Sequence, residues 1–368
     1  MIFMLDFLIV IFNFLSLFSF VYILFIFVIY KLTHFPKIKG DSDIKFPLAS
    51  IIICAYNEEE EIEKTIKKLI SVDYPKNKME IIIVSDSTDR TNEICEKYKK
   101  SVKLIKRYER KGKWSALNEG ISKAKGNIIV TIDADTIVTK NWLKNIVKPY
   151  QDKSIKLTFG PKIAKNPNFD FVTKAHSFYI EINDVVIKAL NNLNLACSPS
   201  GDNMSFRKEV WKKVKFRNVM EEDIDFGIRV FKNGMKCFFV KNAIVRVRIP
   251  INFSDLRYQV VRWMQAFLEL KLFSFLILFI FTFFFPSLSL ITIIYLILIK
   301  NYLITILFTL NVILFIVLYT IFCLKTRSKN FLYSLHLLIL NPIYFLFIIE
   351  NFIRNLLKLK IKWMEYKY

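Results

Sequence analysis

The chain has 368 residues, 54% of them hydrophobic, and its 54 Lys and Arg against 32 Asp and Glu give a net charge of +22. Such a basic and apolar composition is unusual for a soluble protein unless apolar and charged residues are separated along the sequence. Four runs without charge, at 7–30, 272–299, 301–324 and 331–349, supply this separation. The composition therefore indicates a membrane protein with a polar middle, and it excludes a wholly soluble enzyme, a collagen-like chain and a disordered chain.

Each apolar run is long enough, or nearly long enough, to cross a bilayer. The first run exceeds the core of a signal peptide and no small-residue cleavage site follows it, which favours a signal anchor. Lysines follow at 31, 37, 39 and 45, so the positive-inside rule places the next part of the chain in the cytosol. We therefore expect a multi-pass protein of the cell membrane with a cytosolic catalytic domain.

The expected parts are a transmembrane helix at 1–30, a cytosolic domain at 31–250, an amphipathic interfacial helix at 251–271, about three hydrophobic segments at 272–350 and a basic tail at 351–368. Four crossings would leave this tail outside, against the positive-inside rule. A re-entrant or interfacial last run would instead return the tail to the cytosol. Both arrangements stay open, and we favour four crossings.

The five cysteines lie far apart without a CxxC pair, and the three histidines are isolated, so the sequence indicates neither a zinc site nor a disulfide framework. The basic excess either serves anionic lipid and phosphate partners or follows from a lysine-rich genome. No basic helix or stacking motif accompanies the charge, which argues against nucleic acid as a partner.

Short apolar strands alternate with amphipathic helices from about residue 49. The pattern predicts strands at 50–54, 80–84, 102–105 and 127–132, and helices at 58–71, 89–100 and 113–124. This order predicts an α/β fold with a mainly parallel sheet and helices on both of its faces. Ligands of such sheets bind at the carboxyl ends of the strands, in the loops that lead to the helices.

Acidic groups follow three of these strands. Ala55-Tyr56-Asn57-Glu58-Glu59 follows the first, Ser85-Asp86-Ser87-Thr88-Asp89 the second and Asp133-Ala134-Asp135 the fourth. Each group alone is consistent with a helix cap or a turn. Because all three lie at carboxyl ends, one cleft would gather them. The two aspartates after the fourth strand suit Mg²⁺ or Mn²⁺, which usually shares its coordination with substrate phosphates.

Two further charged motifs fit the same chemistry. Lys111-Gly112-Lys113 would add positive charge beside a diphosphate, or it is simply a solvated basic turn. Met220-Glu221-Glu222-Asp223-Ile224-Asp225 opens a predicted helix, where acids favour the helix dipole. Four acids in five residues exceed what a cap requires, and one of these carboxylates could serve as general base toward a hydroxyl group.

A helical projection of 253–271 separates a polar from an apolar side. The polar side carries Asp255, Tyr258, Gln259, Arg262 and Glu269, and the apolar side carries Phe253, Leu256, Val260, Met264, Phe267 and Leu268. Trp263 falls between them. The pattern is typical of a helix on a membrane surface, apolar side down; the alternative is the start of the next span, with Arg262 snorkelling.

Taken together, these motifs resemble the membrane-embedded family-2 glycosyltransferases, the group of cellulose, chitin and hyaluronan synthases and their non-processive relatives. The resemblance covers roughly residues 48–270. It rests on five motifs in the family's order: Ala55-Tyr56-Asn57-Glu58, Gly112-Lys113-x-x-Ala116-Leu117-Asn118, Asp133-x-Asp135, Glu222-Asp223 and Gln259-x-x-Arg262-Trp263. It implies a GT-A fold that binds a nucleoside-diphosphate sugar, usually uridine-linked, together with Mg²⁺ or Mn²⁺.

The resemblance also implies roles for single residues. Asp223 would be the catalytic base and Asp135 a metal ligand. The nucleotide or its sugar would be bound by Ala55, Tyr56, Asn57, Glu58, Asp86, Lys113, Asp133, Gln259, Arg262 and Trp263. The acceptor would be bound by Gly201, Asp202, Glu222 and Trp263. The run after the second strand is one residue shorter than in the family, so either Ser85 or Asp86 meets the nucleotide.

The expected activity is an inverting transfer to a lipid or a lipid-linked glycan, with membrane lipid as a further partner. A processive polysaccharide synthase is the alternative, although the spans are fewer than in cellulose synthases. A non-catalytic subunit that binds sugar nucleotides should lack the base, and Asp223 is present. A transporter should carry charged or broken helices in mid-membrane, whereas these runs are nearly free of charge.

Overall fold

The computed structural model describes residues 46–166 and 170–270 and short stretches beyond them, of which 346–354 is the longest. These residues belong to two compact units. One unit holds 46–165 and 183–248, and the other holds the described residues of 166–182 and those from 249 onward.

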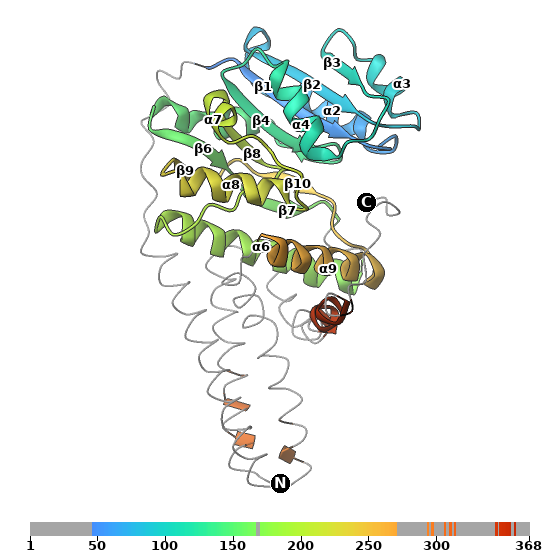
Figure 1. Ribbon diagram of the computed structural model, residues 1–368, viewed down its shortest axis with the longest axis vertical. Helices are drawn as coiled ribbons and strands as arrows, with labels where there is room; N and C mark the ends of the chain where they lie inside the picture. The colour runs from blue at the N-terminus through green and yellow to red at the C-terminus, as the bar shows by residue number, and fades with distance from the viewer. Residues whose placement is uncertain are drawn as a thin grey trace. The chain divides into compact units, whose positions relative to one another are not determined.

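The first unit is built on a sheet whose strands alternate with helices in the first part of the chain (Figure 1). In chain order the elements are β1 (Ala49–Ala55), α2 (Ile62–Ile70), β2 (Met79–Ser85), α3 (Thr91–Glu96), β3 (Val102–Lys106), α4 (Lys113–Ser122), β4 (Ile128–Asp133), β5 (Ile137–Val138), α5 (Trp142–Val147), β6 (Ile155–Phe159) and β7 (Lys162–Ala164). They are followed by α6 (Phe171–Asn192), β8 (Met204–Arg207), α7 (Lys208–Lys213), α8 (Glu222–Lys232), β9 (Lys236–Phe239) and β10 (Val245–Val247). Helix α6 begins in the other unit, and the division falls after residue 182.

Within the described residues the main sheet has seven strands in the order β3-β2-β1-β4-β8-β6-β9. Strands β3, β2, β1 and β4 run parallel, β8 is antiparallel to both of its neighbours, and β9 is parallel to β6. A smaller sheet has the order β5-β10-β7. The predicted α/β class and mainly parallel sheet are confirmed. The four predicted strands all form, each within one residue of the expected bounds at either end.

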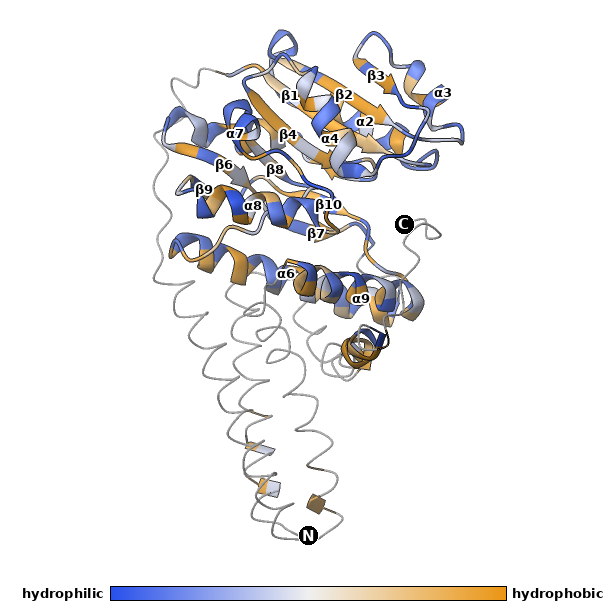
Figure 2. Ribbon diagram, viewed as in Figure 1, coloured by the Kyte–Doolittle hydropathy of each residue, from blue (hydrophilic) through white to orange (hydrophobic). Residues whose placement is uncertain are grey.

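The central strands are apolar over most of their length (Figure 2), because both faces of the sheet are covered. Ile51, Ile52 and Ile53 are successive residues of β1 and all are fully buried. Helix α4 packs so closely on β1 and β2 that a Cβ on Gly120 would lie 2.8 Å from Ile52 Cγ2. Only glycine fits this approach, so the burial of α4 against the sheet depends on it.

Helix α2 starts at Ile62 rather than at the predicted residue 58. The backbone N–H groups of Asn57 and Glu58 donate to Ser87 Oγ at 2.9 Å and Thr91 Oγ1 at 2.8 Å. Asn57 also has a left-handed φ of 56°, which asparagine tolerates better than most residues. The residues before α2 therefore belong to a loop held by a second loop, a long-range contact that helical periodicity does not reveal.

The second unit contains α9 (Phe253–Glu269), close to the predicted helix at 253–271. Asn252 caps it by accepting the N–H of Asp255 at 2.9 Å. The prediction that the apolar side of α9 faces lipid is wrong at the centre of the helix, because Leu256, Val260 and Met264 are buried. Phe253 at the start of α9 remains 48% exposed. Burial within the chain, rather than lipid, therefore covers most of the apolar side of α9.

Among the residues that the structure describes, no helix combines the length and the apolar character needed to cross a bilayer. The runs expected as spans, at 7–30, 272–299, 301–324 and 331–349, lie outside the described residues, apart from isolated positions and part of the last run. The expected parts at 1–30 and 272–350 and most of the tail are therefore predictions from sequence.

Candidate active site

The loops after β1 and β2 are joined by the side chain of Asn57. Its Oδ1 accepts the backbone N–H of Thr88 at 2.9 Å. Ser85, one of the two alternatives for nucleotide contact, is fully buried, and its hydroxyl donates to Ser87 Oγ at 2.9 Å. Asp86 carries the carboxylate at the carboxyl end of β2, and its backbone N–H donates to the carbonyl of Ala55, the first residue of the Ala55–Glu58 motif, at 3.1 Å.

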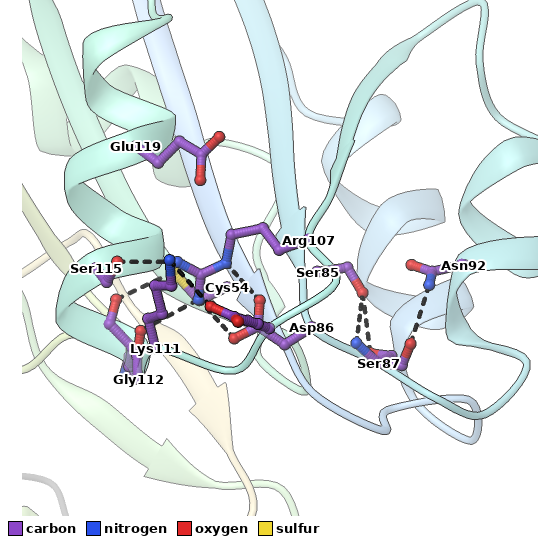
Figure 3. Close-up of polar contacts among 12 residues, drawn as sticks. Cys54, Ser85, Asp86, Ser87, Asn92, Arg107, Lys111, Gly112, Ser115 and Glu119 are labelled. Atoms are coloured by element: carbon purple, nitrogen blue, oxygen red, sulfur yellow. Dashed lines mark hydrogen bonds and ion pairs between the residues drawn. The ribbon is translucent and has the colours of Figure 1, made fainter.

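Asp86 is bound on both carboxylate oxygens by Arg107, which follows β3 (Figure 3). Arg107 Nε and one terminal nitrogen each donate to Asp86 at 2.5 Å, and both side chains are less than a tenth exposed. The guanidinium also donates to Ser115 Oγ at 3.0 Å and to the carbonyl of Gly112 at 3.3 Å. Arg107 thus links the carboxyl end of β2 to the start of α4.

Gly112 precedes α4 with a φ of 84°, a conformation that favours glycine. This turn places Lys113 at the first position of α4, where its Nζ lies 2.7 Å from Asp133 Oδ1 and 3.4 Å from Glu222 Oε1. Burial would lower the pKa of Lys113, but Asp133, Glu222 and Asp223 outweigh it and hold the pKa well above its usual range. Lys113 is therefore a permanent cation between two acidic motifs that lie 89 residues apart (222 minus 133).

Asp223 lies in the first turn of α8 and is 8% exposed. Its Oδ2 accepts the backbone N–H of Gly201 at 2.5 Å, and its Oδ1 accepts the N–H of Ile224 at 2.7 Å. A Cβ on Gly201 would lie 3.2 Å from both Asp223 Oδ2 and Lys113 Nζ. The structure therefore brings together the predicted base, the predicted acceptor segment and the predicted phosphate-side lysine.

Asp202 is the next residue along the acceptor segment and is also buried, with 8% of its surface exposed. Its Oδ2 lies 3.6 Å from Lys162 Nζ, and Lys162 in turn donates to Ser200 Oγ at 3.0 Å. Within the described residues, Asp202 Oδ1 is buried without a hydrogen-bond partner. This oxygen can accept a hydrogen bond from a ligand.

The backbone next to Asp202 is fixed by Asn203. The Asn203 side chain accepts from Trp142 Nε1 at 2.9 Å and donates to the carbonyls of Pro161 and Ala243 at 3.0 and 2.8 Å. All four residues belong to the same unit. The direction of the acceptor segment is therefore set by a buried network and not by Asp202 itself.

Acidic side chains crowd the carboxyl end of β4. Burial and the charges of Asp133 and Asp202 raise the pKa of Asp135 to about 6. Burial and the charges of Asp135 and Asp133 raise the pKa of Glu58 to about 8. Burial likewise raises the pKa of Asp202, although Lys162 opposes the shift. Burial is the largest cause of all three shifts, and the charges of neighbouring carboxylates add to it.

A hard divalent cation fits this excess of carboxylate charge. No group of three or more His, Cys, Asp or Glu side chains within the described ranges is arranged to hold a metal ion by itself. Mg²⁺ commonly takes one or two protein carboxylates and completes its coordination with substrate phosphates and water. The pair Asp133 and Asp135 fits that pattern.

Sequence reasoning missed Arg107 and Lys162. The charged groups after the first, second and fourth strands were recognised, but Arg107, which follows the third strand by one residue, was not. The same rule of strand carboxyl ends would have found it. Lys162 opens β7, a three-residue strand without a clear pattern, so nothing in the sequence marked it.

Residues 50–215 match the family model described as Glycosyl transferase family 2. They form a family 2 glycosyltransferase domain. The domain contains the Asp133–Asp135 pair, Lys113 and Gly201, whereas Asp223 lies eight residues beyond its end (223 minus 215).

Similar proteins agree with this assignment. Beta-monoglucosyldiacylglycerol synthase of Synechocystis sp. is 37% identical over 246 residues, which cover 63% of this chain and 50% of that protein. Poly-beta-1,6-N-acetyl-D-glucosamine synthase of Staphylococcus epidermidis is 27% identical over 226 residues, which cover 59% of this chain and 54% of that protein. The chain thus spans about half the length of these relatives.

The fold is similar to that of the mannosyltransferase PcManGT from Pyrobaculum calidifontis, whose structure was solved with GDP-Man and Mn²⁺. The similarity has a TM-score of 0.62 at 16% sequence identity and covers 95% of this chain and 100% of that one. At this identity the likeness concerns the fold, and it agrees with the GT-A-like α/β architecture expected from the motifs.

The last motif, Gln259-x-x-Arg262-Trp263, lies on α9 in the second unit. Within that unit the Trp263 ring stacks on His176, with centroids 6.0 Å apart, and lies 5.7 Å from the Tyr179 ring. The His176 ring is itself hydrogen-bonded through Nδ1 to the Tyr344 hydroxyl at 2.7 Å. The roles of Gln259, Arg262 and Trp263 toward nucleotide and acceptor stay predictions.

Proposed function

We propose that the chain transfers a sugar from a nucleoside-diphosphate sugar, with uridine as the favoured nucleoside, to a hydroxyl group of a membrane-associated lipid or lipid-linked glycan. The observation that carries this proposal is that Asp223 meets Lys113 and Asp133 of the family 2 domain, with Lys113 2.7 Å from Asp133 and the Gly201 N–H bound to Asp223. The name of the Synechocystis relative, a synthase of a glucosylated diacylglycerol, supports the lipid acceptor.

The donor diphosphate would lie at the carboxyl end of β4. Asp133 and Asp135 would hold Mg²⁺ or Mn²⁺, and such a cation would neutralise the charge that develops on the leaving diphosphate. The solved structure of PcManGT with GDP-Man and Mn²⁺ supports the combination of nucleotide sugar and metal. Lys113, which the neighbouring acids keep protonated, would place a second positive charge beside the phosphates.

Asp86 and the loop of Ala55, Tyr56, Asn57 and Glu58 would bind the nucleoside part of the donor. Arg107 already neutralises Asp86 and fixes both of its oxygens. A bidentate pair of this kind is geometrically specific. Asp86 would therefore present a fixed acceptor edge to the nucleoside, and the same arginine would hold the Gly112 turn that positions Lys113.

Asp223 would act as the general base. Its carboxylate would take the proton of the acceptor hydroxyl while that oxygen forms a bond to the anomeric carbon. The bond from this carbon to the diphosphate oxygen would break on the opposite side, so the configuration would invert. One carboxylate is enough for this displacement, whereas retaining glycosidases need a second one as nucleophile. The Gly201 N–H, which donates to Asp223 Oδ2, would keep the base in place.

Asp202, Gly201 and Glu222 would line the acceptor side. The unpartnered Oδ1 of Asp202 would accept a hydrogen bond from a sugar or lipid hydroxyl, with Lys162 holding the other oxygen. Gln259, Arg262 and Trp263 would complete the binding of nucleotide and acceptor. For Arg262, substitution by alanine should lower turnover in a protein that still inserts into membranes and folds.

The test uses the full chain purified in lipid nanodiscs. Radiolabelled UDP- and GDP-sugars are offered with diacylglycerol and with a lipid-linked glycan extract, and the products are separated by mass. A product with one or two added sugars supports the proposal. A long polymer would favour the processive alternative, and donor binding without transfer under every condition would favour the non-catalytic one.

A further inference from the structure

The helical residues at 343, 344 and 346–354 form an amphipathic helix. From the sequence, these residues are divided between the last expected membrane segment and the basic tail. The helix is drawn red in Figure 1 and is largely orange, the colour of apolar residues, in Figure 2. One side is buried and carries Tyr344, Ile348 and Asn351. The other side is apolar and exposed; it carries Leu346 at 61%, Ile349 at 38%, Phe352 at 65% and Ile353 at 47% exposure.

The exposed apolar side occupies roughly a third of the helix circumference, as 100° per residue places it. A stripe of this width normally faces a protein core or a membrane surface. Here the stripe is exposed, while Asn351, a polar residue, is buried on the other side. An exposed apolar stripe of this kind is not expected on a helix that faces water.

An ion pair ties this helix to α9 within the second unit. Arg257 Nε donates to Glu350 Oε2 at 2.6 Å, and Arg354 Nε donates to Glu350 Oε1 at 2.7 Å. The hydrogen bond from Arg257, opposed by burial and assisted by Arg354, holds the pKa of Glu350 below its usual value. Residue 350 therefore lies beside residue 257, with its carboxylate ionised.

This contact limits how many times the chain can cross the membrane after α9. The runs at 272–299 and 301–324 would take the chain across and back. A third crossing at 331–349 would place residue 350 on the far side of a hydrocarbon core about 30 Å thick. An N–O distance of 2.6 Å between Arg257 and Glu350 is incompatible with that separation.

We propose that the helix at 343–354 lies in the headgroup region of the membrane, on the same side as α9, with its exposed apolar stripe against the lipid. The sequence supports an anionic lipid surface as the partner. From residue 354 to the end it carries Arg354, Lys358, Lys360, Lys362 and Lys367 against the single acid Glu365. Basic residues close to an anionic surface are attracted to it. This placement also removes the conflict of the tail with the positive-inside rule.

The first test determines the side of the tail. A peptide tag is added after Tyr368, and sealed inside-out vesicles from expressing cells are treated with protease. We expect the tag and the catalytic domain to be digested together. A tag that survives while the catalytic domain is digested would show a third crossing after α9 and overturn the proposal. This readout does not depend on enzymatic activity.

The second test measures the depth of the helix in phosphatidylglycerol vesicles. Trifluoromethylphenylalanine is placed at Phe352 or, as a control, at Tyr108, a fully exposed aromatic of the catalytic domain. We expect dissolved oxygen, which concentrates in lipid, to relax the fluorine signal at 352 several-fold more than at 108. A water-soluble gadolinium chelate should instead relax the fluorine signal at 108 more than the signal at 352. A label at 352 that responds like the one at 108, or to neither reagent, would overturn the proposal.

Discussion

Substituting Asp223 by asparagine separates its role as a base from its role in the fold. Both carboxylate oxygens accept backbone N–H groups, from Gly201 at 2.5 Å and from Ile224 at 2.7 Å. Asparagine offers one acceptor oxygen, so one of these N–H groups would meet an amide NH₂. The loss of one buried hydrogen bond costs about 1–3 kcal/mol. Since domains are stable by about 5–15 kcal/mol, the variant should melt at a lower temperature but still fold.

The loss of turnover should be larger than this loss of stability explains. Asparagine cannot take the acceptor proton, and a general base contributes about 10²–10⁴-fold. That factor corresponds to about 3–5 kcal/mol in the activation barrier. Transfer of radiolabelled sugar, normalised to folded protein, should fall by this factor. The affinity for the nucleoside diphosphate, the part of the donor that calorimetric titration can follow without turnover, should change little.

Asp225→Asn is the matched control. Asp225 lies in the same turn of α8, is 7% exposed, and pairs with Arg229, whose Nε donates to its Oδ2 at 2.7 Å. Its loss should lower the melting temperature and leave turnover per folded molecule within a few-fold of the native value. Equal losses of turnover in the two variants, or native turnover with Asp223→Asn, would refute the assignment of Asp223 as the base.

Three further outcomes are expected. Arg107→Ala should lower the free energy of unfolding by about 3–5 kcal/mol because Asp86 is left buried and unpaired. The double variant Arg107→Ala and Asp86→Ala should lose less stability than the two single variants added together. Thermal melts of the three variants measure both effects. Lys162→Gln should raise the KM for the substrate that Asp202 contacts while kcat changes less, which steady-state kinetics can separate. Excess EDTA should abolish turnover and added Mn²⁺ should restore it; full activity in EDTA would exclude the metal at Asp135.

The parallel half of the sheet could be predicted because its strands are buried on both faces and therefore appear as continuous apolar runs. The acids after these strands could be predicted for a topological reason, since parallel strands bring their carboxyl ends to one edge. Asp133 and Lys113 do meet there, at 2.7 Å. Local patterns were sufficient wherever the contact partners followed from strand order.

Contacts between distant segments with no periodic pattern could not be predicted. The anchoring of Asp223 by the Gly201 N–H, for example, joins a loop to the start of a helix 22 residues further along the chain. The insertion of β8 between β4 and β6, antiparallel to both, also follows from tertiary packing alone. Amphipathicity of α9 revealed which side is apolar, but not that protein rather than lipid covers Leu256 and Val260.

The crowded acids predict an unusual dependence of stability on pH. The pKa of Glu58 is about 8 in the folded chain against an ordinary value of 4.5, and that of Asp135 is about 6 against 3.8. Between each pair of values the folded state holds a proton that the unfolded state has lost, so the contribution of these groups to stability falls as pH rises through this window.

A bound cation would take the place of these protons, so Mn²⁺ should weaken the fall. The measurement is the melting temperature of the full chain between roughly pH 5 and pH 9, with and without Mn²⁺, for the native protein and for Glu58→Gln. Glu58→Gln should be less sensitive to pH than the native chain when no cation is present, because its share of the titration has been removed. If the melting temperatures of the two proteins instead depend on pH in the same way, Glu58 is ionised across the whole range. Burial and the charges of Asp133 and Asp135 would then not raise its pKa, and the reasoning would be refuted.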